Sequence, residues 1–341
     1  MIDHKELLVS VVCTTYNHEA YVRQALEGFV MQKTNFSFEV IVHDDASTDS
    51  TVQIIKEYES KYPNLFRNIY QIENQYSQRK DIWGNLFCNY CAGKYIAICE
   101  GDDYWTDPLK LQKQVDFLEV NLEYGLCHTE CDVFYQEQKL WKRNYNSLKM
   151  LDNNMIYPPD ILLEKILSGR YFIKTASVLV RRVLIDVAFQ KLKQQKFPMG
   201  DTPLWATLSQ ITKFYYFQES MIVYRRVANS ASNQCNIEKY LHFKLGGAEM
   251  RLSFKNDYPF SKSFQQKIQQ DYNKYYLNYS LFNPQIQSIF PLIDLTSMSK
   301  IKVKICKIFM IRVSFKYCYT VYYKTYFSLI AAYRLAQKIL C

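Results

Sequence analysis

The first hundred residues alternate between two hydrophobic patterns, one typical of buried strands and one typical of amphipathic helices. Short apolar runs rich in β-branched residues predict buried strands, and apolar residues at helical spacing predict the helices between them. The predicted strands are 8–15, 38–43, 66–72 and 94–99, and the predicted helices are 19–32, 51–62 and 81–92. Repeated β-α-β units of this length predict a parallel sheet covered by helices on both faces.

The pattern is less regular in the rest of the chain. Asp107 and Pro108 suit the N-cap and first turn of a helix over 108–121. Further strands are predicted at 125–135 and 173–182, further helices at 159–168 and 183–195, and a closing strand or hairpin at 213–225. A polar segment over 139–157 predicts no element, and beyond residue 232 the pattern turns helical and polar.

Polar side chains gather where three of the predicted strands end. In doubly wound sheets, ligands bind beyond the carboxyl ends of the strands. The clusters are Thr14, Tyr16 and Asn17 after the first strand, Asp44, Asp45, Ser47 and Asp49 after the second, and Glu100, Asp102 and Asp103 after the fourth. Ser47 and Asp49 also suit capping of the helix that follows. Carboxylates at one edge repel one another unless a cation or hydrogen-bond donors lie among them, which indicates a ligand or cation site.

The segments that carry these clusters resemble family 2 glycosyltransferases of the GT-A fold. They are VSVVCTTYNHEAYVRQAL, FEVIVHDDASTDST and KYIAICEGDDYWTDPLKLQKQVDFL, and the match spans about residues 8 to 226. The ordered combination of three motifs is specific, whereas a lone acidic pair would not be. The resemblance implies an α/β fold of the GT-A nucleotide-sugar-binding type, with a mostly parallel sheet flanked by helices and a C-terminal helical extension. The chain departs from many members at Thr15, where they carry Pro.

The resemblance also implies how a nucleotide sugar would bind. Thr14 and Tyr16 would line the base pocket, and Asp45 would hydrogen-bond the base. Arg79 or Lys80, in the loop QYSQRKD, would touch the diphosphate, although a solvated loop charge explains both residues at least as well.

The acids after the fourth strand would hold the ribose and a metal ion. In this resemblance Asp102 belongs to the nucleotide-sugar site, Asp103 holds a Mg²⁺ or Mn²⁺ that bridges the diphosphate, and Glu100 lies beside them. A hard cation prefers carboxylate and phosphate oxygens and neutralises charge on a departing diphosphate.

The second half would supply the acceptor base. In FPMGDTPLWATLS, Asp201 matches the acid that takes the acceptor proton in inverting members. Without the resemblance, Asp201 before Thr-Pro is better explained as a helix cap. Thr175 and Ser177 would face the acceptor, and Arg225 or Arg226 would meet the diphosphate.

Ten cysteines and an N-terminus without a secretory signal pattern favour a reducing cytoplasm, with buried thiols. Cys88, Cys91, Cys127, His128 and Cys131 could mimic a zinc site, but the helical spacing of the first two favours packing. The sequence contains no run of eighteen uninterrupted apolar residues, so we predict no transmembrane helix.

The net charge of +9 comes from the C-terminal tail. Residues 300–341 hold seven Lys, two Arg and no acid, interleaved with aromatic and aliphatic residues. Such a segment suits an anionic membrane surface, packing on the main domain, or, least favoured, nucleic acid. The predicted organisation is a GT-A domain over 1–230, a helical extension over 231–299 and the tail over 300–341.

The sequence therefore predicts an inverting glycosyltransferase that uses a nucleoside diphosphate sugar, with UDP-sugar favoured. The predicted acceptor is a saccharide or lipid-linked saccharide in cell-surface polysaccharide biosynthesis, such as capsule or lipopolysaccharide, at the cytoplasmic face of the plasma membrane. The alternatives are a non-catalytic nucleotide-sugar-binding or scaffold protein, and a nucleotidyltransferase. The last would carry a Gly-rich basic loop, which CTTYNHEAYVR lacks.

Overall fold

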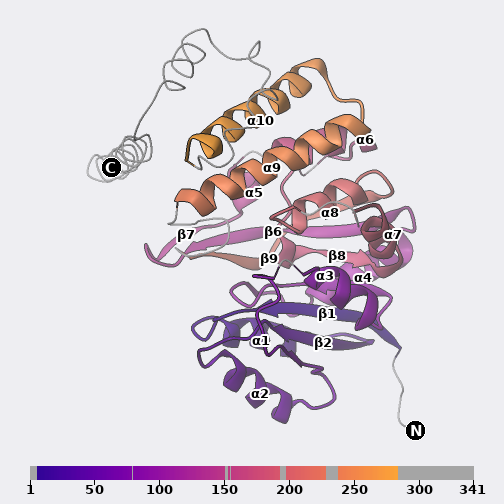
Figure 1. Ribbon diagram of the computed structural model, residues 1–341. Coiled ribbons are helices and arrows are strands. Elements are labelled where there is room, and N and C mark those ends of the chain that lie inside the picture. The colour runs from indigo at the N-terminus through magenta and orange to yellow at the C-terminus, as the bar shows by residue number, and fades with distance from the viewer. Residues whose placement is uncertain are drawn as a thin grey trace, which may run out of the picture. The chain divides into compact units, whose positions relative to one another are not determined.

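The computed structural model describes residues 6–78, 80–149, 153, 155–192, 197–227 and 237–282. The chain divides into two compact units, Met1–Asn233 and Gln234–Cys341. Among the described residues, the first unit contains one nine-stranded sheet flanked by helices (Figure 1). This arrangement confirms the predicted α/β fold.

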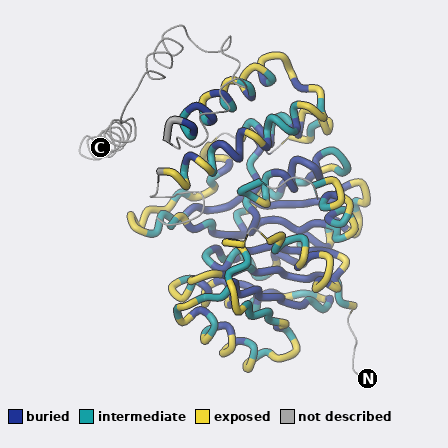
Figure 2. The backbone as a smooth tube through the Cα atoms, in the orientation of Figure 1, coloured by how far each residue is buried: buried dark blue, intermediate teal, exposed yellow. Residues whose placement is uncertain are grey.

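The first half of this unit is a set of parallel β-α-β units. Its elements are β1 Leu7–Thr15, α1 Val22–Val30, β2 Ser37–Asp44, α2 Thr51–Lys61, β3 Ile69–Tyr70, α3 Ile82–Asn89 and β4 Tyr95–Ile98. Strand β1 pairs in parallel with both β2 and β4, and β3 extends the sheet beyond β2. The strands are largely buried, as the dark blue of Figure 2 shows. Helix α1 begins three residues later than predicted, because a turn at His18 precedes it.

The second half extends the sheet with mixed pairing. Its elements are β5 Tyr104–Trp105, α4 Lys110–Val120, β6 Tyr124–Tyr135, β7 Leu140–Lys142, α5 Tyr145–Leu148, α6 Pro159–Ser168, a 3₁₀ turn at Thr175–Ser177, β8 Leu179–Arg181, α7 Arg182–Leu192, α8 Asp201–Leu208 and β9 Lys213–Arg226. The strand order is β3-β2-β1-β4-β8-β6-β9-β5, with β7 on β6. Strand β8 runs antiparallel to β4 and β6, whereas β6 and β9 are parallel. All strand pairs in the first half of the sheet are therefore parallel, as predicted, and the second half mixes parallel and antiparallel pairs.

The closing segment, predicted as a strand or a hairpin, is one long strand, β9. Two local predictions need correction. The predicted strand over 173–182 shortens to β8, because the 3₁₀ turn takes up its first part. Helix α4 begins at Lys110, so Asp107 is not the N-cap of this helix. Instead, Asp107 Oδ1 accepts from the Leu109 N–H at 2.8 Å in the turn before the helix.

Trp105 fixes the short strand β5 directly after the acidic pair. Its ring packs edge-on against Phe29 with centroids 4.9 Å apart, and its Nε1 donates to the Ala176 carbonyl at 2.9 Å. A Cβ atom at Gly28 would lie 2.9 Å from the Trp105 backbone nitrogen, so glycine permits helix α1 to approach β5 this closely. The tryptophan therefore ties the acidic loop to α1 and to the 3₁₀ turn.

The second unit contains helices α9 Ile237–Asp257 and α10 Lys262–Phe282. Leu245, Tyr276 and Leu277 form a small buried cluster between them. In the described part of the chain, none of the helices is both long enough and apolar enough to cross a bilayer. The tail over 300–341 lies outside the described residues.

A buried lysine lies in the core of the first unit. The Lys110 side chain is fully buried, with Nζ 4.2 Å from the Trp105 ring centroid and 2.8 Å from Gln114 Oε1. Burial lowers the pKa of Lys110 from 10.5 to about 7, because the charged form loses its hydration. The folded state therefore favours the neutral amine.

This lysine predicts a pH-dependent stability. Between pH 7 and 10.5 the unfolded chain keeps a proton that the folded chain has released, so the free energy of unfolding rises with pH, by up to about 1.4 kcal/mol per unit. We expect Lys110→Met to remove this slope. The difference in unfolding free energy, variant minus wild type, should fall by up to about 3 kcal/mol between pH 7 and 9.5. Urea denaturation at both pH values measures it, and a constant difference would contradict the prediction.

Candidate functional site

Three loops meet at the carboxyl edge of the parallel strands. The Gly101 N–H donates to the Thr14 carbonyl, and the Asp45 N–H donates to the Thr15 carbonyl, both at 2.9 Å. A Cβ atom at Gly101 would lie 3.0 Å from His18 Nδ1 and 3.1 Å from Thr15 Cβ. Glycine at this position allows the acidic loop to lie directly against the loop after β1. The structure therefore brings together the three polar clusters that the sequence predicts.

The loops after β1 and β2 interlock through short polar side chains. Asn17 adopts a left-handed conformation with φ 54°, which asparagine tolerates better than most residues. Its N–H donates to Ser47 Oγ at 2.9 Å, and its side-chain oxygen accepts from the Thr48 N–H at 2.8 Å. Asp44 is buried and accepts from Ser47 N–H and Oγ. The Tyr16 ring next to this lock is 45% exposed and remains available to a ligand.

Asp45 anchors the next loop along the edge. Its carboxylate is buried and accepts from the backbone N–H groups of Gln75 at 2.6 Å and Tyr76 at 3.0 Å. A carboxylate has about four acceptor positions, so two bonds leave room for a further donor such as a nucleotide base. Lys80 is exposed, and Arg79 lies outside the described residues.

Four carboxylates converge beside this edge. Glu100, Asp102 and Asp103 come from the loop after β4, and Asp201 comes from the start of α8. Burial raises the pKa of Glu100, and the charges of Asp102 and Asp201 raise it further. Burial also raises the pKa of Asp103, followed by the charges of Asp102 and Glu100. The folded chain thus concentrates negative charge where it is least favourable without a cation.

Arg225 holds the acidic loop in place. Its backbone N–H donates to Asp103 Oδ1 and its Nε donates to the Asp102 carbonyl, each at 2.8 Å. Its terminal nitrogens donate to Gln136 Oε1 at 2.8 Å and to Gln24 Oε1. The guanidinium is buried and lies 4.9 Å from the centroid of the Tyr21 ring. Three of the five guanidinium N–H groups of Arg225 thus bind protein acceptors, so this side chain holds the acidic loop in place. Its expected contact with the diphosphate stays a prediction.

Asp201 is the first residue of α8, after an N-cap at Gly200. Its Oδ1 accepts from the Thr202 N–H at 2.6 Å, so it also takes part in capping the helix. The helix N-terminus favours a carboxylate there. The side-chain hydrogen bonds of Asp201 among the described residues all involve Oδ1, and the residue is half-buried.

The 3₁₀ turn before β8 contributes a residue that sequence reasoning missed. Thr175 and Ser177, expected to face the acceptor, are buried, and Ser177 Oγ donates to the Lys174 carbonyl at 2.7 Å. Lys174 itself places its ammonium 3.2 Å from the centroid of the Tyr224 ring. Its charge counteracts the raised pKa values of Glu100 and Asp103. The sequence signal for Lys174 is weak, because it is one basic residue within the predicted strand 173–182.

The candidate zinc residues do not come together. Cys91, Cys127 and Cys131 are buried as expected, but Cys88 is exposed, with Sγ 3.5 Å from Asp186 Oδ1. His128 is buried and its Nε2 lies 3.0 Å from the Tyr171 hydroxyl. Across the described residues, no three His, Cys, Asp or Glu side chains form a preformed metal site.

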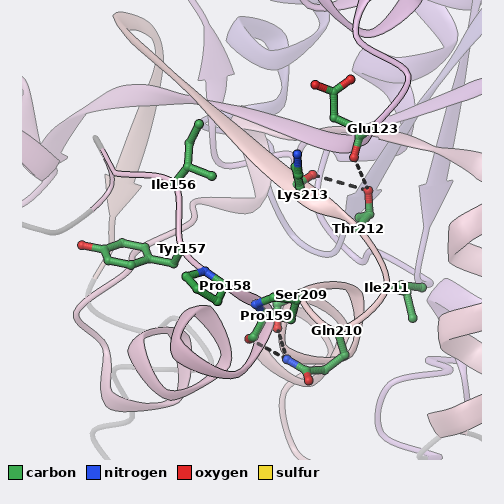
Figure 3. A pocket seen from close by; sticks show the side chains of 10 residues that line it. All are labelled: Glu123, Ile156, Tyr157, Pro158, Pro159, Ser209, Gln210, Ile211, Thr212 and Lys213. Atoms are coloured by element: carbon green, nitrogen blue, oxygen red, sulfur yellow. Dashed lines mark hydrogen bonds between the residues drawn. The ribbon is translucent and has the colours of Figure 1, made fainter.

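A cavity of about 530 Å³ lies elsewhere in the first unit (Figure 3). Glu123 and residues 156–159 and 209–213 line it. Glu123 precedes β6 and Lys213 begins β9, so the cavity lies where these strands start. Strand β8 is antiparallel to both β4 and β6, so β4 and β6 run in the same direction. The acids follow the carboxyl end of β4 and the cavity lies at the amino end of β6, so the two are at opposite ends of the strands. None of the predicted site residues lines it.

Comparisons with known proteins agree with this architecture. The family description Glycosyl transferase family 2 matches residues 10–188, more than half of the chain, and the chain belongs to this family. Protein Rv1520 of Mycobacterium tuberculosis, itself uncharacterized, is 36% identical over 228 residues, which cover 65% of this chain and 59% of the relative. This chain therefore spans less than two thirds of that relative.

Two further proteins extend the comparison. TuaG of Bacillus subtilis, provisionally named a teichuronic acid biosynthesis glycosyltransferase, is 32% identical over 111 residues, 33% of this chain and 42% of TuaG. The crystal structure of S. aureus TarS 1-349 in complex with UDP-GlcNAc has a TM-score of 0.50 and 16% identity, covering 81% of this chain and 74% of that one. The structural likeness confirms the GT-A type of fold.

The Arg225 contacts predict a large effect of a conservative change. Lysine lacks the planar fork of arginine and cannot reach Gln24, Gln136 and the Asp102 carbonyl together. We expect Arg225→Lys to lower the free energy of unfolding by about 2 kcal/mol or more, since buried acceptors lose their donor. Urea denaturation measures this, and Arg226→Lys, an exposed neighbour, serves as the control. Equal stability of the two variants would rule out the positioning role.

Proposed function

We propose that this chain is an inverting glycosyltransferase that moves a sugar from a nucleoside diphosphate, with UDP favoured, to a hydroxyl of a saccharide. The single observation that carries the proposal is that the charge of Asp201, at the start of α8, acts on Glu100 in the loop after β4. This supports a general base beside the three loops that follow β1, β2 and β4. Membership of the family supports the same activity.

The donor would lie along the edge formed by β1, β2 and β4. Tyr16 offers an exposed ring face and Thr14 a half-buried side chain to the base. Asp45 keeps acceptor positions for a base N–H after binding its own loop. Asp102 lies at the next loop along the edge, where the ribose and diphosphate would follow.

The acids suit a Mg²⁺ or Mn²⁺ by their chemistry. Carboxylates are hard donors, and Mg²⁺ is commonly held by one or two carboxylates together with substrate phosphates. Although the four carboxylates act on one another, no three described side chains form a preformed metal site, which fits an ion that arrives with the diphosphate. Asp103 and Asp102 would hold it, with Asp102 the less buried of the two. The bound ion would supply positive charge at the leaving diphosphate.

Asp201 would act as the general base. It would take the proton of the acceptor hydroxyl as that oxygen bonds to the anomeric carbon. The bond from this carbon to the diphosphate oxygen would break on the opposite face, which inverts the configuration. The electron pair would leave with the nucleoside diphosphate. A position in the first turn of a helix suits a carboxylate electrostatically.

The proposed acceptor and cellular location rest on the similarity to TuaG and on the composition of the C-terminal segment. The likeness to TuaG favours cell-surface polysaccharide biosynthesis, with a saccharide or lipid-linked saccharide as acceptor. The basic, aromatic segment 300–341 favours contact with an anionic membrane at its cytoplasmic face. We propose a GT-A domain over 1–230, a helical extension over 231–299 and this membrane-contacting tail. We propose no nucleic-acid partner for this chain.

The proposal is tested by nucleotide binding and donor turnover in one variant. We expect the wild type to bind UDP or GDP with Mn²⁺ and to release it from one of a panel of nucleotide sugars. Asp201→Asn should keep nucleotide affinity within about threefold and lower release by about 100-fold or more, since general-base catalysis contributes on that scale. Calorimetry and a nucleotide-release assay measure the two effects.

Asp160→Asn is the matched control, because Asp160 is an exposed acid in the first turn of α6. It should change neither quantity. If the wild type binds neither nucleotide, the enzyme proposal fails. Binding without any turnover would instead favour the non-catalytic alternative, and loss of nucleotide binding in Asp201→Asn would place Asp201 in the donor site.

A further inference from the structure

Lys174 lies on an aromatic surface beside the acidic cluster. Its Nζ is 3.2 Å from the centroid of the Tyr224 ring and 4.7 Å from that of Phe172. Tyr224 directly precedes Arg225, whose N–H binds Asp103. The backbone of Lys174 is also fixed, because its carbonyl accepts from the N–H and Oγ of Ser177. The ammonium is therefore held at a defined place next to the acids.

The ammonium is not neutralised by the protein. Within the residues that the structure describes, Lys174 forms no ion pair with a carboxylate within 4.0 Å, and no hydrogen bond of its Nζ is found. A ring face attracts a cation without accepting its N–H groups as a carboxylate would. The three N–H donors thus remain free for an anion that enters between the lysine and the acids.

We propose that Lys174 is a built-in cation of the donor site, whose ammonium binds the terminal phosphate of the nucleoside diphosphate. This inference rests on the proposed function. A diphosphate that approaches Glu100, Asp102 and Asp103 meets like charges, so a divalent ion alone leaves repulsion uncompensated. A lysine that is already in place offers a compact positive charge to phosphate.

The terminal phosphate is favoured over the one next to the ribose because of where Lys174 lies. Lys174 comes from the segment before β8, and because β8 is antiparallel to β4, with Ala97 opposite Leu179, this segment lies beside the end of β4 and the acids that follow it. These acids are the proposed ligands of the metal ion at the leaving diphosphate, so the lysine would lie where the bond to the sugar breaks. The alternative is that Lys174 only balances the acids of the empty site, in which case the number of phosphates on the ligand would not matter.

The test compares UDP with UMP, and GDP with GMP, in full-length Lys174→Met by calorimetry. In EDTA, the diphosphate should bind about 10- to 100-fold more weakly than to the wild type, as expected for loss of a charged hydrogen bond. The monophosphate should change less than about threefold. With Mn²⁺, the loss of diphosphate affinity should persist. Lys174→Arg, which keeps the charge, should restore much of it.

Lys142→Met is the matched control. Lys142 also lies on a ring, with Nζ 5.2 Å from the Tyr135 centroid, but on β7. It should change no affinity, and thermal unfolding checks that every variant is folded. Equal losses for diphosphate and monophosphate, or no loss, would overturn the inference while wild-type binding upholds the proposed function. A wild type that binds neither nucleotide would overturn the proposed function, and the inference with it.

Discussion

The candidate site depends on the contacts of one side chain, that of Arg225, with segments far apart in the sequence. The side chain holds the acidic loop at the Asp102 carbonyl and reaches Gln24 in α1 and Gln136 after β6, while the backbone N–H of the same residue binds Asp103. A buried guanidinium is costly unless its donors are bound, and three of its five N–H groups are bound here. These partners meet only when β9 is paired in register with β6. The placement of the carboxylates is therefore a product of sheet assembly and not of the acidic loop alone.

That assembly concentrates charge at a cost to stability. Burial and the charges of neighbouring acids raise the pKa values of Glu100 and Asp103, so ionising these two acids is unfavourable in the folded chain. A cation that enters the site relieves the repulsion, and a diphosphate that enters with it is bound more tightly for that reason. Lys174 relieves only part of it, because its ammonium rests on a ring and not on a carboxylate. The same electrostatic frustration thus makes the site receptive to both a metal ion and a phosphate.

The sequence predicts the parts of the fold and site that are local. Strands β1, β2 and β4 follow from apolar runs, and the loops after them from polar residues at the strand ends. Strands β5 and β7 were missed, because two or three residues carry no periodicity and their strand state depends on pairing with β9 and β6. The roles of Arg225 and Lys174 were missed for the same reason, since their partners lie on other strands. Asp201 was singled out through the family motif, because its local pattern alone is better explained by a helix cap.

The reversal of strand direction at β8 explains why the second half of the site exists. In a parallel strand, the segment that precedes the strand lies at the opposite edge from the carboxyl ends. Because β8 is antiparallel to β4, with Ala97 opposite Leu179, the segment before β8 lies instead beside the end of β4. Lys174 is in that segment, and this is how its charge reaches Glu100. If β8 ran parallel to β4, Lys174 would lie at the opposite end of the strands, and the acids would lack its charge.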